Sequence, residues 1–162
     1  MKKTVVFLIL LAVVSSSCNN TEPAMLTEEQ KQAIINEIEV VDAAIADRLN
    51  NRDAAGAFGY FSENNFLKFI DNGQLKTDLN SVTSNFAEGF ANFESVKLLF
   101  ADRQYSVLTS NLVLSTASFT EEIITFSRDT LNFNGAMTTL FQKSDDSWQV
   151  LHVHQSYFPV SK

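Results

Sequence analysis

Cysteine and histidine are scarce in this chain of 162 residues. The single cysteine, Cys18, excludes a disulfide within the chain. The only two histidines, His152 and His154, could supply two metal ligands from one strand, since they lie two residues apart. A catalytic zinc site needs a third protein ligand, and there is no third histidine or second cysteine to provide it. A carboxylate could do so, but no motif indicates one, and we therefore expect no metal and no cofactor.

Positive charge is also in short supply, with 12 lysines and arginines against 19 aspartates and glutamates and a net charge of −7. This balance excludes an electrostatic attraction to nucleic acid or to anionic lipid headgroups. The sequence has neither a phosphate-binding glycine loop nor the Gly-x-Ser-x-Gly motif of serine hydrolases. Five glycines and two prolines against fourteen phenylalanines indicate one packed domain with a sizeable core, not a disordered chain.

The N-terminal stretch MKKTVVFLILLAVVSSSC has the pattern of an export signal. A positively charged start at Lys2 and Lys3 precedes an apolar run over 4–14 and the small residues of 15–17. The apolar run is too short to span a bilayer permanently. We therefore expect a signal peptide over 1–17 that takes no part in the fold.

Cys18 directly follows these small residues and resembles the lipidated cysteine of a bacterial lipoprotein. The commoner motif has leucine where Ser15 stands, and an ordinary secretory signal cut near Ser17 is the alternative. The resemblance implies lipidation of Cys18 and a lipid-anchored tether over 18–26. We then expect the protein in the bacterial cell envelope, facing the periplasm and touching the membrane through the anchor only.

Helical patterns come first along the chain and strand patterns follow. Thr27 and Gln30 form a capping box before a helix expected over 28–50. Asp53 can cap a second helix over 54–62. Thr77 can cap a third helix, which carries apolar residues on one face from Leu79 to Phe93. Between these two helices a short strand over 65–70 ends in an Asp-Asn-Gly turn. Four strand-like stretches follow, over 96–108, 111–124, 131–143 and 148–157. This order predicts an α+β fold.

The C-terminal hairpin resembles that of the nuclear transport factor 2-like superfamily. Its last strand carries Trp148, His152, His154 and Ser156 in the pattern Trp-x-x-x-His-x-His-x-Ser, after a charged turn. The nearest branches are the SnoaL-like proteins and the association domain of calcium/calmodulin-dependent protein kinase II. The resemblance implies a SnoaL-like domain over 27–162, cone-shaped, with three N-terminal helices packed on a curved, mostly antiparallel sheet. It also implies a homodimer through the sheet, but no particular activity.

Strand alternation divides the last strand between two faces. It predicts Trp148, Val150, His152, His154 and Ser156 on one face, and Gln149, Leu151, Val153, Gln155 and Tyr157 on the other. The resemblance implies that the second set faces a ligand pocket, which we expect to contain Thr139, Val153, Gln155 and Tyr60. Members of the kinase branch have arginine where Thr139 and Gln155 stand. Neutral residues there predict an apolar pocket that does not clamp a carboxylate and suits a small apolar ligand.

Three residues are candidates for catalysis: His154 as a base, Asp71 and Tyr60. Steroid isomerases of this fold place a carboxylate where Lys68 or Phe69 stands here, and the turn chemistry alone explains Asp71. The sequence therefore favours a lipid-anchored, non-catalytic small-molecule-binding or interaction module. The alternative is a SnoaL-like isomerase, cyclase or dehydratase acting on a small apolar carbonyl compound. A carboxylate or imidazole facing a substrate-sized cavity would favour the enzyme.

Overall fold

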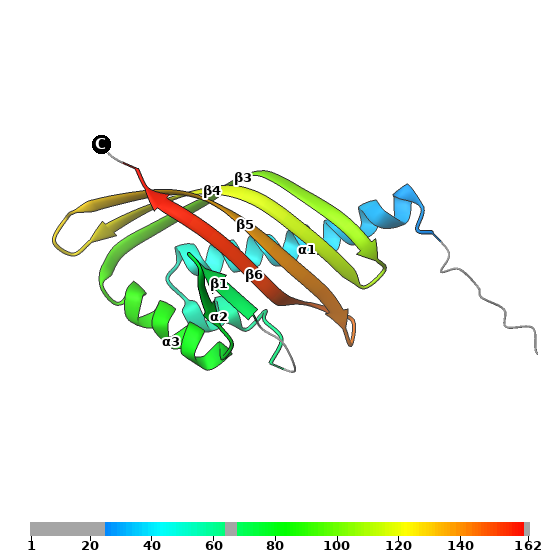
Figure 1. Cartoon of the computed structure of the whole chain (residues 1–162), viewed down its shortest axis with the longest axis horizontal. Helices are drawn as coiled ribbons and strands as arrows, with labels where there is room; N and C mark the ends of the chain where they lie inside the picture. The colour runs from blue at the N-terminus through cyan, green and yellow to red at the C-terminus, as the bar shows by residue number, and fades with distance from the viewer. Residues whose placement is uncertain (1–24, 64–67, 161–162) are drawn as a thin grey trace, which may run out of the picture.

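The computed structural model describes residues 25–63 and 68–160. In these residues there are three helices and six strands, and all three helices precede the four long strands (Figure 1). The elements are α1 (Glu28–Asn50), α2 (Ala54–Phe58), β1 (Lys68–Asp71), β2 (Gln74–Lys76), α3 (Leu79–Phe90), β3 (Phe93–Thr109), β4 (Leu112–Thr125), β5 (Thr130–Ser144) and β6 (Ser147–Pro159). The predicted signal peptide, Cys18 and most of the predicted tether lie outside the described residues.

The strands form one curved sheet in the order β2-β1-β6-β5-β4-β3 (Figure 1). Among the six strands of the described residues, β1 and β6 pair in parallel and the other neighbouring strands pair antiparallel. All three helices lie on the concave side, with α1 running along the long strands and α2 and α3 beside β1 (Figure 1). The prediction of an α+β cone with helices packed on a curved, mostly antiparallel sheet is confirmed.

Side-chain caps set the starts of the helices. Thr27 and Gln30 form the predicted capping box of α1, and Asp53 accepts a hydrogen bond from the Gly56 amide at the start of α2. The predicted cap of α3 was wrong by one residue. Asp78, not Thr77, caps this helix by accepting a hydrogen bond from the Ser81 amide.

Helix α2 ends at Phe58, four residues before the predicted end, because backbone groups that follow it form hydrogen bonds with β6. The Val150 amide donates to the Tyr60 carbonyl, and the Ser62 amide donates to the Val150 carbonyl. Phe61 thereby forms an isolated parallel bridge with Val150. The short strand β2 was not predicted. It follows the turn at Asn72 and Gly73 and has only three residues, which is too short for a recognisable strand pattern.

A β-bulge in β6 overturns the predicted division of its faces. Leu140 pairs with His152 and Phe141 pairs with Val150, so Leu151 is the extra residue and the alternation shifts by one. Trp148 and Val150 are therefore buried on the concave side with Val153. His152 and His154 lie on the opposite, outer face, as Ser156 does. The prediction that Trp148 and Val150 share a face with the histidines was wrong.

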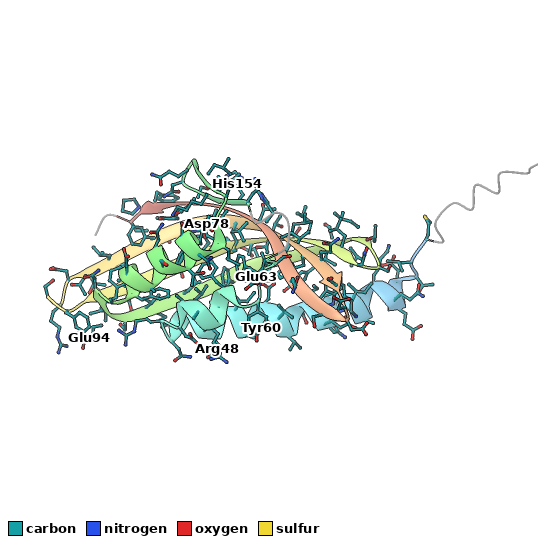
Figure 2. The ribbon with its side chains drawn as sticks, turned by 90° about the horizontal axis from the view of Figure 1, so that it is seen from below. Arg48, Tyr60, Glu63, Asp78, Glu94 and His154 are labelled. Atoms are coloured by element: carbon teal, nitrogen blue, oxygen red, sulfur yellow. The ribbon has the colours of Figure 1, made fainter. Side chains whose placement is uncertain are left out.

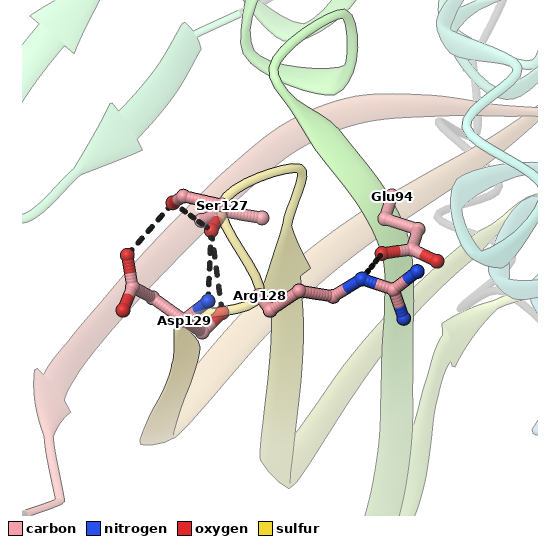
Figure 3. Close-up of polar contacts among 5 residues, drawn as sticks. Glu94, Ser127, Arg128 and Asp129 are labelled. Carbon is pink, nitrogen blue, oxygen red and sulfur yellow. Dashed lines mark hydrogen bonds and ion pairs between the residues drawn. The ribbon is translucent and has the colours of Figure 1, made fainter.

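The turn between β4 and β5 is held by its own side chains (Figure 3). The Ser127 hydroxyl lies 2.8 Å from the Thr125 hydroxyl and donates to Asp129 over 2.7 Å. Arg128 has a positive φ of 70° and pairs with Glu94 at the start of β3 over 3.3 Å. The pair is largely exposed and so adds little stability, but the contacts fix this turn beside the beginning of β3.

Within residues 25–63 and 68–160, no helix combines the length and apolar character needed to cross a bilayer.

Candidate functional site

A cavity of about 380 Å³ lies between the helices and the concave face of the sheet. This volume is in the range of small-molecule sites. Most of its wall is apolar, and the phenylalanines that are so frequent in the sequence account for much of it. The cone is therefore hollow and not filled by its own side chains.

The aromatic rings form two separate groups on facing walls of the cavity. The helix-side wall carries rings from α2, the segment directly after it, β1 and α3, with the centroids of contacting rings 4.8 to 6.2 Å apart: Phe58, Phe61, Phe69, Phe86 and Phe90. The sheet-side wall carries a second chain of contacts, 5.6 to 6.4 Å apart: Phe100, Phe119, Tyr157 and Phe133. No ring contact among the described residues joins the two groups. Aromatic side chains of this kind give the cavity a predominantly apolar surface.

Polar side chains meet at one corner of the cavity, where β1, β2, β4 and β6 approach one another. We call Asp71, Lys76, Glu121, Gln155 and Tyr157 the polar corner; all five line the cavity. Gln155 donates to Asp71 over 3.3 Å, and Lys76 reaches the other Asp71 oxygen at 3.4 Å. The Tyr157 hydroxyl lies near Asp71, close enough for the charge of Asp71 to act on it. The register explains this convergence, since Asp71 and Gln155 are paired in the parallel ladder of β1 and β6.

Glu121 is the second carboxylate of the polar corner. Burial raises the pKa of Glu121 above its ordinary value, and the negative charge of Asp71 raises it further. Burial likewise raises the pKa of the Tyr157 hydroxyl, with the charge of Asp71 as the next cause. The two carboxylates thus differ in environment: Asp71 is contacted by Gln155 and Lys76, whereas Glu121 makes no hydrogen bond among the described residues. Such a difference separates an acid from a base in many active sites.

A further carboxylate, Asp42 of α1, reaches the cavity from the side of β3. It forms an ion pair with Arg103 and accepts a hydrogen bond of 2.9 Å from the Tyr105 hydroxyl. The Arg103 guanidinium also lies over the Phe100 ring, 4.2 Å from its centroid. These contacts tie α1 to β3 and support the wall of the cavity.

The sequence-predicted pocket residues have different positions in the structure. Thr139, Val153 and Gln155 line the cavity, and Thr139 is 5% exposed. Tyr60 is not part of the cavity wall, because the bridge between Phe61 and Val150 turns the chain there. Figure 2 shows Tyr60 beside α1 and well apart from His154. Of the three catalytic candidates, only Asp71 faces the cavity.

His154 is exposed on the outer face of the sheet. It borders a separate open hollow together with Asp102, Ser118 and Ser156. Ser118 donates to Asp102 over 3.1 Å there. Among the described residues, no group of three or more histidine, cysteine, aspartate or glutamate side chains could hold a metal ion. The geometry separates the histidines from the cavity and leaves the acid–base groups to the polar corner.

Sequence reasoning missed Glu121, Lys76 and Tyr157 as site residues. Glu121 stands in the pair Glu121-Glu122, which looks like a solvated stretch of β4. A signal was nevertheless present, because strict alternation from the buried Ser115, Ala117 and Phe119 continues to Glu121 on the same face. An acid at a core-facing position is unusual and indicates a functional site.

Comparison with known proteins agrees with this architecture. The family model of the SnoaL-like domain matches residues 38–161. The chain belongs to the SnoaL-like family. No curated protein matches the chain in sequence. The family resemblance predicted from the C-terminal hairpin is therefore confirmed at the level of the domain.

Solved structures of the nuclear transport factor 2-like superfamily share the fold of this SnoaL-like chain at low sequence identity. A superfamily member from Salmonella enterica serovar Typhimurium has a TM-score of 0.70 and 14% identity, over 82% of this chain and 94% of that one. A protein from Novosphingobium aromaticivorans, provisionally named a scytalone dehydratase, has a TM-score of 0.72 and 10% identity, over 82% and 89%. A hexachlorocyclohexane dehydrochlorinase from Novosphingobium barchaimii has a TM-score of 0.67 and 7% identity, over 83% and 95%. These likenesses show the fold and assign no activity to this chain.

Proposed function

We propose that this SnoaL-like protein binds a small, neutral, largely apolar compound in the cone and catalyses proton transfer on it at the polar corner. The observation that carries the proposal is the presence of two carboxylates in different environments, Asp71 and Glu121, in the wall of an aromatic cavity. The sequence favoured a non-catalytic module because it placed no acid in the pocket. The position of these acids favours an elimination or isomerisation on a carbonyl compound.

Each side chain of the polar corner has a separate role in this proposal. Asp71 takes a proton from a carbon of the bound compound, and Glu121, whose raised pKa favours its protonated form, donates a proton or a hydrogen bond to the oxygen that gains negative charge. Tyr157 lies near both acids, so its hydroxyl orients the base. Lys76 compensates the charge of Asp71 from the other oxygen. The facing aromatic walls exclude water and hold the apolar part of the compound.

Binding without catalysis is the second candidate function. It is favoured by the partners of Asp71, since both of its oxygens already have contacts within the protein. In that case the polar corner recognises a hydroxyl or carbonyl group and the compound leaves unchanged. Both candidates require the same cavity and the same selectivity for neutral compounds.

The selectivity can be tested with a matched pair of probes, 2-acetylnaphthalene and 2-naphthoate. We expect the neutral ketone to bind at least tenfold more tightly, because a carboxylate next to Asp71 loses hydration without gaining a free cation. Asp71→Asn should reduce the difference in affinity between the two probes, because it should improve binding of 2-naphthoate. His154→Gln is the matched control on the outer face of β6 and should change neither affinity. Tighter binding of the carboxylate to the parent, or loss of binding in a stable His154→Gln variant, would contradict the proposed site.

We also propose that the chain is lipid-anchored through Cys18 in the bacterial envelope, facing the periplasm. The export-signal pattern and the position of Cys18 after the small residues support this proposal. Cys18→Ala should remove labelled fatty acid from the protein and move it from the membrane fraction to the soluble one. A parent that takes up no label would show that the signal is an ordinary secretory one.

A homodimer through the outer face of the sheet remains a proposal. Three large apolar side chains on strands of this sheet, Leu99, Leu108 and Phe158, are exposed and support it. Sedimentation of the purified domain should give twice the mass of the chain, and a monomer at all concentrations would contradict the dimer.

A further inference from the structure

Gly135 lies in β5 beneath the Phe119 ring of the sheet-side wall, at a point where two neighbouring strands bring aromatic residues toward it. In the ladder it pairs with Phe119 of β4 on one side and with Tyr157 of β6 on the other. These three positions share the concave face of the sheet. Gly135 is therefore the only one of the three without a ring, and it sits between the two rings.

The space that a side chain would need at Gly135 is already occupied. A Cβ atom there would lie 2.3 Å from Cζ of Phe119 and 2.6 Å from the carbonyl oxygen of Ser156. Both distances are far below van der Waals contact, so either the Phe119 ring or the β6 backbone would have to move. The missing side chain thus lets the Phe119 ring lie across β5 and lets β6 approach β5 closely at Tyr157.

The position of Tyr157 depends on both of these features. Its ring packs against Phe119, with centroids 6.4 Å apart, and makes a T-shaped contact with the Phe133 ring, with centroids 5.6 Å apart. Its backbone follows directly after Ser156, the residue whose carbonyl meets the missing Cβ. Its amide donates a hydrogen bond of 2.8 Å to the Asn72 side chain next to Asp71, and its side chain lines the cavity in the polar corner. Any shift of Phe119 or of β6 at Ser156 therefore moves the Tyr157 hydroxyl relative to Asp71 and Glu121.

We propose that Gly135 is a positioning residue that fixes Tyr157 in the polar corner and sets the depth of the cavity, and so limits the size of the ring compound that binds. The part of this inference that concerns the ligand rests on the proposed function, whereas the part that concerns Tyr157 does not. A methyl group at residue 135 lifts the Phe119 ring off the sheet and into the cavity. The cavity then becomes shallower on the sheet side, while the helix-side wall is untouched.

The ligand part is tested with phenol and 2-naphthol, which share a hydroxyl and differ by one ring. Gly135→Ala should weaken binding of 2-naphthol at least tenfold and binding of phenol by less than threefold. Gly135→Ala/Phe119→Leu, which shortens the displaced side chain, should recover most of the loss for 2-naphthol. Asn134→Ala is the matched control, because Asn134 is the exposed neighbour on the opposite face of β5. Equal loss for both phenols, or none, would overturn the size limit.

The Tyr157 part is tested by ultraviolet titration of the tyrosine hydroxyls, which needs no ligand. Tyr157 is identified as the tyrosine whose titration is missing in the Tyr157→Phe variant. In the parent protein and in Asn134→Ala, Tyr157 should ionise at a higher pH than a free tyrosine. In Gly135→Ala it should ionise at a lower pH than in the parent, since the hydroxyl leaves its buried place beside Asp71. An unchanged titration in a folded Gly135→Ala variant would overturn the positioning role. A parent that binds neither phenol would count against the proposed function and would leave this second test in force.

Discussion

Glu121 is the side chain on which the acid–base interpretation depends. Folding raises the pKa of Glu121 above its ordinary value of 4.5, because the carboxyl is buried and Asp71 adds a like charge. Between the unfolded and the folded pKa, the folded state binds more protons than the unfolded state. The stability that this carboxyl contributes is therefore fully present below the unfolded pKa and is lost as the pH rises through the folded one.

Glu121→Gln should remove this pH dependence. We expect the urea midpoint of the variant to rise relative to that of the parent as the pH increases through the interval above 4.5, because glutamine cannot ionise. Urea unfolding at several pH values measures the difference directly. Glu122→Gln, on the exposed face of the same strand, controls for loss of a surface charge. Parallel curves for the parent and Glu121→Gln would mean that Glu121 is solvated and is no acid of the proposed kind.

At the scale of residues, the sequence predicted the pocket-facing side of β6 only beyond the bulge. Val153 and Gln155 line the cavity as the strand alternation indicates, and Thr139 faces them from β5. Tyr60 could not be placed from periodicity, since its backbone pairs with Val150 instead of continuing a helix. The partners of Asp71 are equally hidden in the sequence, because Lys76 and Gln155 reach it from separate strands.

At the scale of elements, α1 protects the free edge of the sheet. The Asn50 side chain at the C-terminal end of α1 accepts a hydrogen bond of 2.6 Å from the Leu98 amide and donates one of 3.2 Å to the Leu98 carbonyl. Strand β3 is the last in the sheet, so these two groups have no neighbouring strand on that side. The amide of Asn50 thus takes the place of a strand partner and covers the edge.

Asn50→Ala should destabilise the fold by about 1–3 kcal/mol, the usual cost of leaving a partly buried backbone donor and acceptor without partners. Amide hydrogen exchange at Leu98 should accelerate more than exchange elsewhere in β3. Asn51→Ala is a suitable control, because among the described residues that side chain donates its hydrogen bond to the Asp47 carbonyl of α1 and not to β3. Equal effects of the two substitutions would show that Asn50 does not hold the edge strand.

Element order and type could be read from the sequence, but strand register could not. Periodicity and caps gave all three helices and the four long strands, because long amphipathic segments carry strong signals. The bulge at Leu151 leaves no mark on the pattern of β6, and it moves Trp148 and Val150 to the concave side. A single inserted residue thus decides which side chains of β6 face the core. The position of that residue is set by the pairing of β6 with β5, which the sequence pattern does not show.

At the scale of the whole molecule, the cone brings together distant parts of the chain. The polar corner joins Asp71 and Lys76 from the first half with Glu121, Gln155 and Tyr157 from the second. Parallel pairing of β1 with β6 makes this possible, because it places the end of β1 beside the end of the chain. The fold class and the apolar cavity follow from composition and from the family resemblance, whereas the acid–base groups come together only through this topology.

Proton exchange on a bound ketone tests the proposed chemistry most directly. In D₂O, loss of the methyl proton signal of 2-acetylnaphthalene reports proton abstraction next to the carbonyl group. We predict that the parent protein accelerates this exchange, and that Asp71→Asn lowers the rate about 100-fold, a typical contribution of a general base. His154→Gln should keep the rate of the parent. If the ketone binds but exchanges no faster with the parent than with Asp71→Asn, then the polar corner is not a catalytic site.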